Sequence, residues 1–354
     1  MIPLFRAFPQ LSERLPWCPL GRFPTPVEEL SLLAKLLGRQ GLYVKRDDLS
    51  GNPYGGNKVR KLEFILADAV HKGMRRIVTS GAAGSNHALA TALYGQKLGL
   101  QVELMLFAQP ATAEVRANLL ADFHAGAHLH HADSYAEHVQ MMKEFLVQAE
   151  ARRESLYCIP PGGSCALGAL GYVNASFELK MQIERGELPA PDEIFIAYGT
   201  MGTAVGLALG LSAAGLRSRI RAIRVVPDVV ANDEKYHELF ESTRRMLIES
   251  ELSLANLSFD HAVLSVEHAF YGSGYGEMTR EASEAIEMFD QSQGITLDQT
   301  YTGKTAAAFL AEARCAAGGK NLLFWVTKNS CPLCPESRAI DFHCLPVEFH
   351  RYFE

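Results

Sequence analysis

Glu193-Ile-Phe-Ile-Ala-Tyr198-Gly-Thr-Met-Gly-Thr203 is the stretch that decides the fold, because an apolar strand pattern there runs directly into a glycine-rich turn. The apolar segment 203–214 that follows is predicted to be a helix. Outward from this unit, short apolar segments alternate with segments of helical period. The predicted strands are 41–45, 76–79, 102–107, 128–130 and 221–226, and the predicted helices are 57–71, 85–98, 112–123, 136–153 and 234–251. This alternation is typical of an α/β fold with mainly parallel strands.

The length and composition exclude several classes of protein. The chain has 354 residues, of which 48% are hydrophobic and 21% charged, as in an ordinary globular protein of about two domains. The turn at Pro160–Ser164 interrupts the alternation and is predicted to be a passage between domains. A formal charge of -6 repels a phosphate backbone, so no nucleic-acid partner is expected. The longest weakly polar stretch, 204–216, is too short to cross a membrane, and the first residues lack a secretory signal pattern. We therefore predict a cytoplasmic protein with no membrane partner.

The turn at Gly199, Thr200, Met201, Gly202 and Thr203 has the residue types of a phosphate site. Its two glycines let the backbone approach an anion, and the free N–H groups and dipole of the following helix favour negative charge. The spacing is not that of a dinucleotide-binding motif, and the lysine of a Walker motif is missing. A single phosphate monoester is therefore expected. The alternative is a glycine turn that only packs a helix against a strand.

Lys58 falls in the first turn of a predicted helix. The positive end of the helix dipole disfavours the ammonium form there and lowers the pKa of the amine. A lysine with a lowered pKa can form a Schiff base with a carbonyl compound. The alternative is a solvated surface lysine, since Lys45, Lys61 and Lys72 are close in sequence and look ordinary.

Four further candidates lie on turns. Ser85 follows a predicted strand and opens a predicted helix, where its hydroxyl and the nearby amides can bind a carboxylate. His87, two residues later, is equally consistent with a structural role. Tyr275 and Tyr301 each place a phenol on a turn that contains glycine. Taken alone, each tyrosine is more typical of packing than of chemistry.

Taken in order, these motifs resemble one enzyme family. They are Lys45–Asp48, Gly55–Glu63, Ser85–His87, Pro161–Ser164, Gly171-Tyr172, Tyr198–Thr203, Gly274–Gly276 and Tyr301–Lys304. The series covers residues 15–328 and is similar to the pyridoxal-phosphate enzymes of the D-cysteine desulfhydrase and 1-aminocyclopropane-1-carboxylate deaminase family. The resemblance implies a fold of the tryptophan-synthase-β type, an α/β fold with two open, mainly parallel twisted sheets flanked by helices. It implies a large cofactor-binding domain of residues 1–56 and 165–354, and a small domain of residues 57–164.

The resemblance also implies how the cofactor, pyridoxal 5'-phosphate, is held. Lys58 would carry it as a Schiff base and act as the base at the α-carbon of a small amino-acid substrate. Asn86 would bond its phenolic oxygen, and the turn at 199–203 would hold its phosphate. The cofactor would lie between the two domains of each subunit, and a homodimer is implied.

The substrate would be met by two other groups of residues. Ser85, Asn86 and His87 would bind its carboxylate. Tyr301 would lie against the pyridine ring or near the reacting carbon, with Tyr275 close by as an acid–base or leaving-group contact. The predicted catalytic residues are therefore Lys58, Ser85, Tyr275 and Tyr301.

The residue after the second tyrosine bears on the reaction. In deaminases that act on the cyclopropane substrate a Glu is expected there, where its carboxylate charges the pyridine nitrogen, but this chain has Thr302. A hydroxyl partner, either Thr302 or Thr327, would leave the nitrogen neutral and weaken the electron sink, which favours β-elimination of a good leaving group. We therefore predict a lyase that converts D-cysteine or a related D-amino acid to pyruvate, ammonia and sulfide.

Two alternatives to this lyase are a 1-aminocyclopropane-1-carboxylate deaminase and a non-catalytic homologue that binds the cofactor. The second alternative arises because the family's His-Thr-Gly-Gly segment is replaced here by Val326–Asn329.

The seven cysteines are an odd number and are scattered through the chain, which indicates free thiols. Cys331 and Cys334 form a C-x-x-C pair, but a second such pair is missing. No metal site is predicted, and the pair is expected to be part of an irregular tail.

Overall fold

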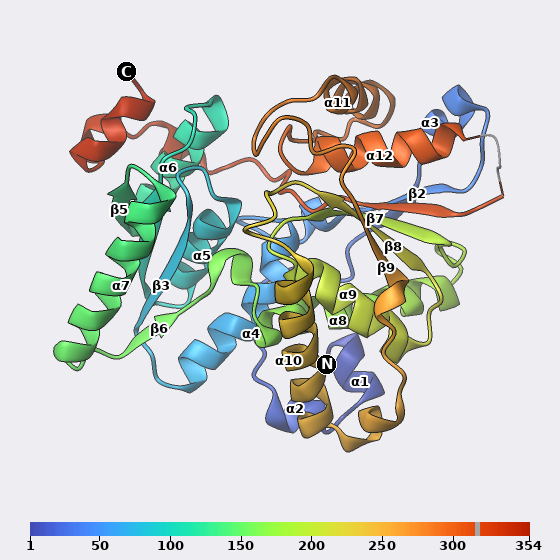
Figure 1. Ribbon diagram of the computed structural model, residues 1–354, viewed down its shortest axis with the longest axis horizontal. Coiled ribbons are helices and arrows are strands. Elements are labelled where there is room, and N and C mark those ends of the chain that lie inside the picture. Colours follow the sequence, from blue (N-terminus) through green and yellow to red (C-terminus); the bar gives the residue numbers. More distant parts are fainter. Residues whose placement is uncertain (316–318) are drawn as a thin grey trace.

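The computed structural model describes residues 1–315 and 319–354 and contains two separate β-sheets (Figure 1). The larger sheet has the strand order β1 (Val27–Glu29), β2 (Leu42–Lys45), β10 (Leu322–Trp325), β7 (Glu193–Tyr198), β8 (Arg219–Arg224) and β9 (Leu264–Glu267). The smaller has the order β5 (His128–Ala132), β4 (Gln101–Phe107), β3 (Arg76–Ala82) and β6 (Leu156–Cys158). Neighbouring strands are parallel except for β1 and β2. The predicted α/β fold with two mainly parallel sheets is confirmed.

Helices flank both sheets. They are α1 (Pro3–Ala7), α2 (Leu11–Arg14), α3 (Ser31–Leu37), α4 (Asn57–His71), α5 (Asn86–Lys97), α6 (Ala113–His124), α7 (Tyr135–Ala151), α8 (Ala166–Glu184), α9 (Gly202–Ala214), α10 (Asp233–Ser250), α11 (Arg280–Gln293), α12 (Thr302–Arg314) and α13 (Pro335–Arg338). The predicted helix over 57–71 and the predicted strand over 193–198 coincide with α4 and β7. In the described ranges, no helix is long and apolar enough to cross a membrane.

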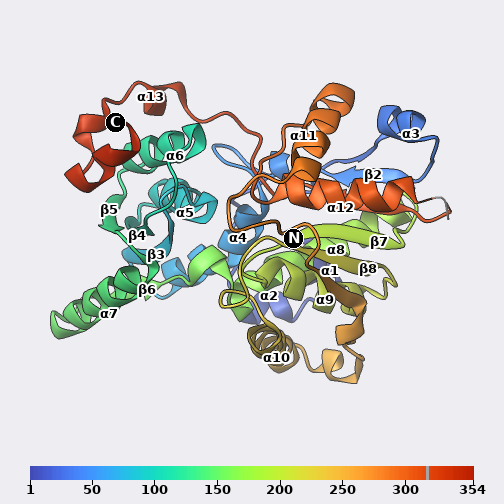
Figure 2. The same cartoon turned by 45° about the horizontal axis from the view of Figure 1, so that its top comes forward.

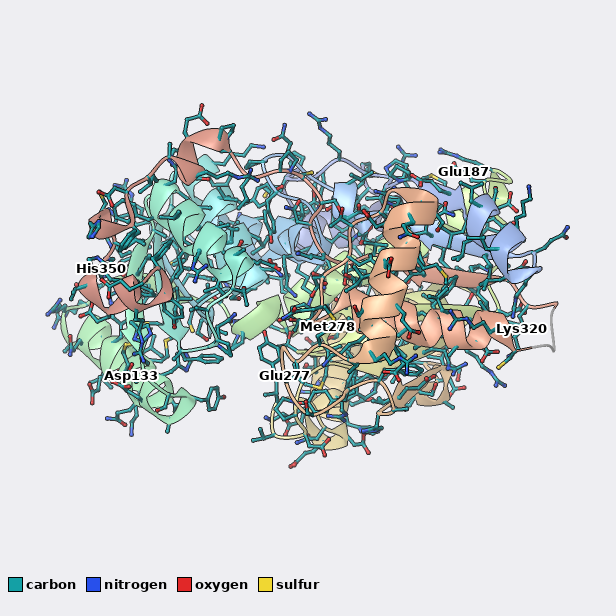
Figure 3. All side chains as sticks on the ribbon, turned by 90° about the horizontal axis from the view of Figure 1, so that it is seen from above. Asp133, Glu187, Glu277, Met278, Lys320 and His350 are labelled. Carbon is teal, nitrogen blue, oxygen red and sulfur yellow. The ribbon has the colours of Figure 1, made fainter. Side chains whose placement is uncertain are left out.

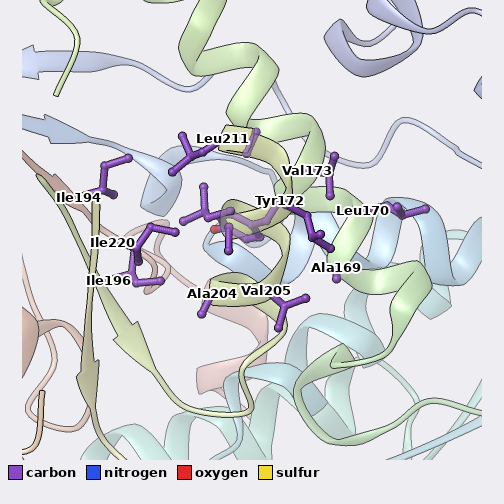
Figure 4. Close-up of a cluster of buried hydrophobic side chains, with 14 of the residues drawn as sticks. Ala169, Leu170, Tyr172, Val173, Ile194, Ile196, Ala204, Val205, Leu211 and Ile220 are labelled. Atoms are coloured by element: carbon purple, nitrogen blue, oxygen red, sulfur yellow. The ribbon is translucent and has the colours of Figure 1, made fainter. Parts of the chain in front are cut away.

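The larger sheet is covered on both faces. Helices α8 and α9 lie against one face, and α11 and α12 lie against the other (Figure 1). Figure 4 shows the first of these layers, where the isoleucines of β7 and β8 meet Tyr172 and Val205. Because such a sheet is buried on both sides, its central strands β7 and β10 are almost entirely apolar, whereas β8, nearer the edge, carries three arginines.

Sequence reasoning missed α8. Thirteen of its 19 residues are buried, and polar positions do not gather on one side of it. A helix that is surrounded by protein shows no amphipathic period, so periodicity does not reveal it. It packs closely against α4, where a Cβ on Gly171 would lie 2.3 Å from the carbonyl oxygen of Arg60. The backbone contact that a glycine permits there holds α4, and therefore Lys58, against the larger sheet.

A buried cluster of charges also fixes α4. The guanidinium of Arg60 lies 2.7 Å from a carboxylate oxygen of Asp47 and 2.9 Å from one of Glu178. Lys45 lies 2.6 Å from Glu178, and the Tyr172 hydroxyl donates to Asp47 at 2.6 Å. Burial alone would raise the pKa of Glu178, but the charges of Arg60 and Lys45 lower it to about 2. Both carboxylates are therefore ionised in the folded protein.

The C-terminal segment returns to the smaller sheet (Figures 1 and 2). Leu345, Phe349 and Tyr352 belong to the same buried cluster as the apolar residues of α5 and α6. The predicted large domain included residues up to 354, whereas these last residues contact the smaller unit. Apolar residues of an irregular tail carry no period that reveals which unit they cover.

Candidate active site

The amino-terminal ends of α4 and α9 meet beside the carboxyl end of β10. The backbone N–H of Asn57 donates to the carbonyl of Thr327 at 2.9 Å. The side-chain amide of Asn57 donates to the hydroxyl of Thr203 at 3.1 Å. Three segments that are far apart in the sequence are thus within hydrogen-bonding distance. Ligands of open parallel sheets bind at this kind of position, outside the carboxyl ends of strands.

The turn before α9 forms an anion cradle. Met201 caps the helix in a left-handed conformation with φ of 66°, the kind of backbone turn whose N–H groups form anion-binding sites. Ser164 donates to the Thr200 hydroxyl at 2.8 Å and accepts from the Gly202 N–H at 3.2 Å. A Cβ on Gly202 would lie only 2.8 Å from Ser164 Oγ. Hydroxyls and amides therefore converge on one small space at a helix N-terminus, as an anion requires.

Lys61 is the cation of this cradle, although it looks ordinary in the sequence. Its side chain is 1% exposed, and Nζ donates to the Gly162 carbonyl at 3.1 Å. A Cβ on Gly202 would lie 2.9 Å from that nitrogen. Burial, and to a smaller extent the charge of Lys58, lowers the pKa of Lys61 well below its usual value. A bound anion would favour the ammonium form again. The one sequence feature that indicates this role is the i, i+3 spacing of Lys58 and Lys61, which places both side chains on one face of α4.

Lys58 occupies the second position of α4, as predicted, and its side chain is partly buried. Burial lowers the pKa of its amine to about 8. Burial is a cause that the sequence alone did not reveal. A neutral amine is accessible near physiological pH, and neutral amines are nucleophiles and bases.

The Ser85 to His87 loop opens α5. Ser85 Oγ caps the helix by accepting from the Ala88 N–H at 3.2 Å, and Asn86 Oδ1 accepts from the Tyr54 hydroxyl at 2.7 Å. The His87 ring is buried and its Nε2 lies 2.9 Å from the Thr79 hydroxyl. Burial, then the charges of the two lysines, lowers the pKa of His87 well below its usual value. Nε2 is bonded to Thr79, while Nδ1 is buried without a partner in the described residues, so this nitrogen and the backbone N–H of His87 are the groups left to meet a carboxylate.

Tyr275 and Tyr301 form a pair, with 2.5 Å between their hydroxyl oxygens. Tyr301 stands immediately before α12, and Tyr275 lies in the loop that continues to Glu277 and Met278, which Figure 3 labels. Tyr275 is 37% exposed. Burial raises the pKa of both hydroxyls. Both groups are therefore protonated at neutral pH and can donate a proton.

Thr302 is not free to meet a ligand. Its hydroxyl donates to Asp298 Oδ1 at 2.6 Å and accepts from the Asp298 N–H at 2.9 Å. The other carboxylate oxygen of Asp298 accepts from the N–H groups of Thr300 and Tyr301 at 2.9 and 2.7 Å. The carboxylate therefore binds the N–H groups of Tyr301 and Thr302 at the start of α12. Thr327, at the end of β10 and 7% exposed, is the second of the two hydroxyls that the sequence proposes for the pyridine nitrogen.

An ion pair crosses between the two units beside this site. Lys328, which follows β10, lies 3.0 Å from the carboxylate of Glu114 in the first turn of α6. Sequence reasoning missed the pair, because nothing in either segment shows that α6 reaches the end of β10. The one sequence feature that points to the pair is Lys328 itself, a charged residue in the segment that replaces the family's His-Thr-Gly-Gly.

Comparisons with known proteins show the family of this chain. A family model described as pyridoxal-phosphate dependent enzyme matches residues 19–328. The chain belongs to this family. A protein of Pyrococcus furiosus, provisionally named 1-aminocyclopropane-1-carboxylate deaminase, is 35% identical over 91% of this chain and 92% of its own length. The D-cysteine desulfhydrase of Serratia proteamaculans is 33% identical over 81% of this chain and 84% of its own length.

Solved structures give the same result. The crystal structure of a homologue of 1-aminocyclopropane-1-carboxylate deaminase is 32% identical, with a TM-score of 0.77 over 91% of this chain and 94% of that one. Threonine deaminase isoform 2 of Solanum lycopersicum is 16% identical with a TM-score of 0.62, which shows the shared fold. The protein is thus a pyridoxal-phosphate-dependent enzyme, and pyridoxal phosphate is its cofactor.

The residues present fit that cofactor. Lys58 supplies an amine with a lowered pKa, and the cradle before α9 supplies hydroxyls, amides and Lys61 for a phosphate dianion. An amine for the aldehyde and an anion cradle for the phosphate are the two fixed requirements of this group.

The cysteine pair lies outside this arrangement. The thiol of Cys331 donates to the Gly51 carbonyl at 3.2 Å, and Cys334 Sγ lies 3.6 Å from His124 Nε2. In the part of the chain that the structure describes, no group of three or more His, Cys, Asp or Glu side chains is arranged to hold a metal ion. The described cysteines are free thiols.

Proposed function

We propose that this enzyme is a lyase that eliminates the β-substituent of a small D-amino acid, with D-cysteine as the leading substrate and pyruvate, ammonia and sulfide as products. The observation that carries the proposal is the state of Thr302. It stands where a glutamate is expected in deaminases of the cyclopropane substrate, and its hydroxyl is bonded to Asp298. Asp298 in turn has its oxygens engaged by the backbone and hydroxyl groups at the start of α12.

The bound cofactor supplies an electron sink for the α-carbon. Without a carboxylate beside the pyridine nitrogen, that electron sink is weak. Because the Thr302 hydroxyl is bonded to Asp298, we assign the Thr327 hydroxyl to the nitrogen. A weak sink suits a reaction that is driven by a good leaving group such as a thiolate. Opening a cyclopropane ring has no such leaving group, so it depends more strongly on the sink.

The side chains then have separate tasks. Lys58 would hold the cofactor through its amine and, as a neutral amine, would accept the α-proton of the substrate. Ser85, Asn86 and the His87 N–H bind the substrate carboxylate and orient the α-hydrogen toward Lys58. The Tyr275–Tyr301 pair donates a proton to the departing thiolate, a task that suits two neutral phenols 2.5 Å apart. Asn86 would also bond the phenolic oxygen of the cofactor.

The proposal also covers the oligomeric state, the compartment and the domains of the protein. We infer a homodimer in the cytoplasm, with a large domain of residues 1–56 and 165–354 and a small domain of residues 57–164 around the cofactor, except that the C-terminal segment around Leu345, Phe349 and Tyr352 packs against the small domain. The two separate sheets support the division into two domains.

1-Aminocyclopropane-1-carboxylate deaminase activity is the second candidate. It is favoured by the identity of 35% to the Pyrococcus furiosus protein that carries this provisional name. The products distinguish the two activities, because the cyclopropane substrate gives 2-oxobutanoate and ammonia without sulfide.

The test is a substrate panel with the cofactor-loaded enzyme. D-Cysteine, L-cysteine, D-serine and 1-aminocyclopropane-1-carboxylate are compared by release of sulfide, pyruvate and 2-oxobutanoate. We expect the highest kcat/KM with D-cysteine, and loss of activity in Lys58→Ala with the fold intact. A preference for the cyclopropane substrate would overturn the proposal. Exchange of the α-hydrogen for deuterium is followed in parallel, since bound cofactor without any exchange would identify a non-catalytic homologue.

A further inference from the structure

A second pocket lies at the opposite end of the larger sheet. It has a volume of about 330 Å³ and is formed where β7 and β8 begin, whereas the candidate active site lies where β7 ends. Its lining residues are Ala190, Pro191, Asp192, Glu193, Arg217, Ser218, Arg219 and Lys320. Figure 3 labels Lys320 at one end of the molecule and Glu277 and Met278, in the loop of Tyr275, near its middle. The pocket is therefore separate from the cofactor site.

The pocket holds more positive charge than its own carboxylates neutralise. The carboxylate of Glu193 is already paired, because its oxygens lie 2.7 Å from Lys320 Nζ and 2.8 Å from the guanidinium of Arg221. Arg217 and Arg219 are both exposed, and neither has a carboxylate within 4.0 Å among residues 1–315 and 319–354. They are two residues apart at the start of β8. Two guanidinium groups without a counter-ion therefore face a small concave space.

Two other lining residues bear on the kind of ligand. Ser218, between the two arginines, is 2% exposed, and its Oγ is buried without a hydrogen-bond partner in the described ranges. A buried hydroxyl without a partner is uncommon and costs free energy unless a ligand or water satisfies it. Asp192 has one carboxylate oxygen occupied, because it accepts from the Asn321 N–H at 2.7 Å. Asp192 therefore remains a negative charge in the pocket and offsets one of the two guanidinium charges.

We propose that this pocket binds a small phosphate group, either inorganic phosphate or a phosphomonoester, between Arg217 and Arg219. The planar guanidinium matches phosphate oxygens in pairs, so two of them can hold several oxygens of one phosphate. A monocarboxylate has only two oxygens to accept these hydrogen bonds. A nucleotide is disfavoured, since the lining has no aromatic side chain for a base and the volume is at the low end for small-molecule sites. This assignment is independent of which amino acid the enzyme consumes.

The test uses the cofactor-loaded enzyme, in which the cradle at 199–203 is already filled by the cofactor's own phosphate. Titration calorimetry with inorganic phosphate and with glycerol phosphate should show one saturable site per chain. The double variant Arg217→Gln/Arg219→Gln should weaken this binding at least tenfold. The matched control Arg75→Gln/Arg245→Gln removes the same charge from exposed positions elsewhere and should bind as the wild type does. The melting temperature should rise with phosphate for the wild type and the control only.

The two probes distinguish the sources of the phosphate group. Tighter binding of glycerol phosphate identifies a phosphomonoester, and equal or tighter binding of inorganic phosphate identifies the free ion. Absence of a saturable site at 10 mM of either probe, on the order of cellular phosphate levels, overturns the proposal. Equal binding by the Arg217→Gln/Arg219→Gln variant, or a preference for succinate over both probes, overturns it as well.

Discussion

The rate at which the cofactor attaches to Lys58 should increase with pH, with a midpoint near pH 8. Burial lowers the pKa of this amine from 10.5 to about 8, a shift that corresponds to about 3 kcal/mol against the ammonium form. Only the neutral amine attacks the aldehyde. Its fraction is about 3% at pH 6.5 and about three quarters at pH 8.5. The rate of attachment should therefore rise about 25-fold over these two pH units and then level off.

The assay mixes cofactor-free protein with pyridoxal phosphate at pH 6.5 to 9.5 and follows the visible absorbance of the covalent link. Nα-Acetyl-lysine in the same buffers corrects for the titration of the cofactor itself, and Lys58→Ala measures the background. With an unshifted lysine the rate would rise about 100-fold over the same interval and continue upward. A rate that still increases tenfold per pH unit at pH 9.5 would refute the argument from burial.

Three further predictions concern neighbouring residues. Lys61→Met should weaken the affinity for pyridoxal phosphate by about 10- to 100-fold, the loss of one charge-assisted contact, as measured by equilibrium dialysis, while the far-ultraviolet circular dichroism stays unchanged. Thr327→Ala should shift the absorbance of the bound cofactor because it changes the environment of the pyridine nitrogen, whereas Thr302→Ala should leave the absorbance unchanged and cost about 1 kcal/mol of stability through the loss of its hydroxyl's hydrogen bonds with Asp298; the reverse pattern would assign the nitrogen to Thr302. Arg60→Met should lower the free energy of unfolding by about 3 to 5 kcal/mol in urea titrations, because two buried carboxylates lose their main partner, and a loss below about 1 kcal/mol would show that the buried charges are not coupled as the structure indicates.

The local units of this protein follow from its sequence alone. The strand, turn and helix over 193–214 and the helix over 57–71 were predicted nearly to the residue, because a short apolar run, a glycine turn and a helical period are properties of neighbouring residues. The order of the motifs also indicated the family, which the match over residues 19–328 confirms. Lys58 was selected for its position at a helix start, and the structure places it there.

What only the tertiary structure decides is the set of partners of each side chain. Lys61 looked like a surface lysine, yet it is buried beside the start of α9 because residues about 140 positions later fold over it. The Thr302 hydroxyl was a candidate for the cofactor until Asp298 was seen to occupy it, and the His87 ring turned out to face Thr79. Helix α8 was missed since it is surrounded by protein. In each case the deciding quantity is burial or hydrogen bonding by groups that are not neighbours along the chain, and periodicity carries no information about those groups.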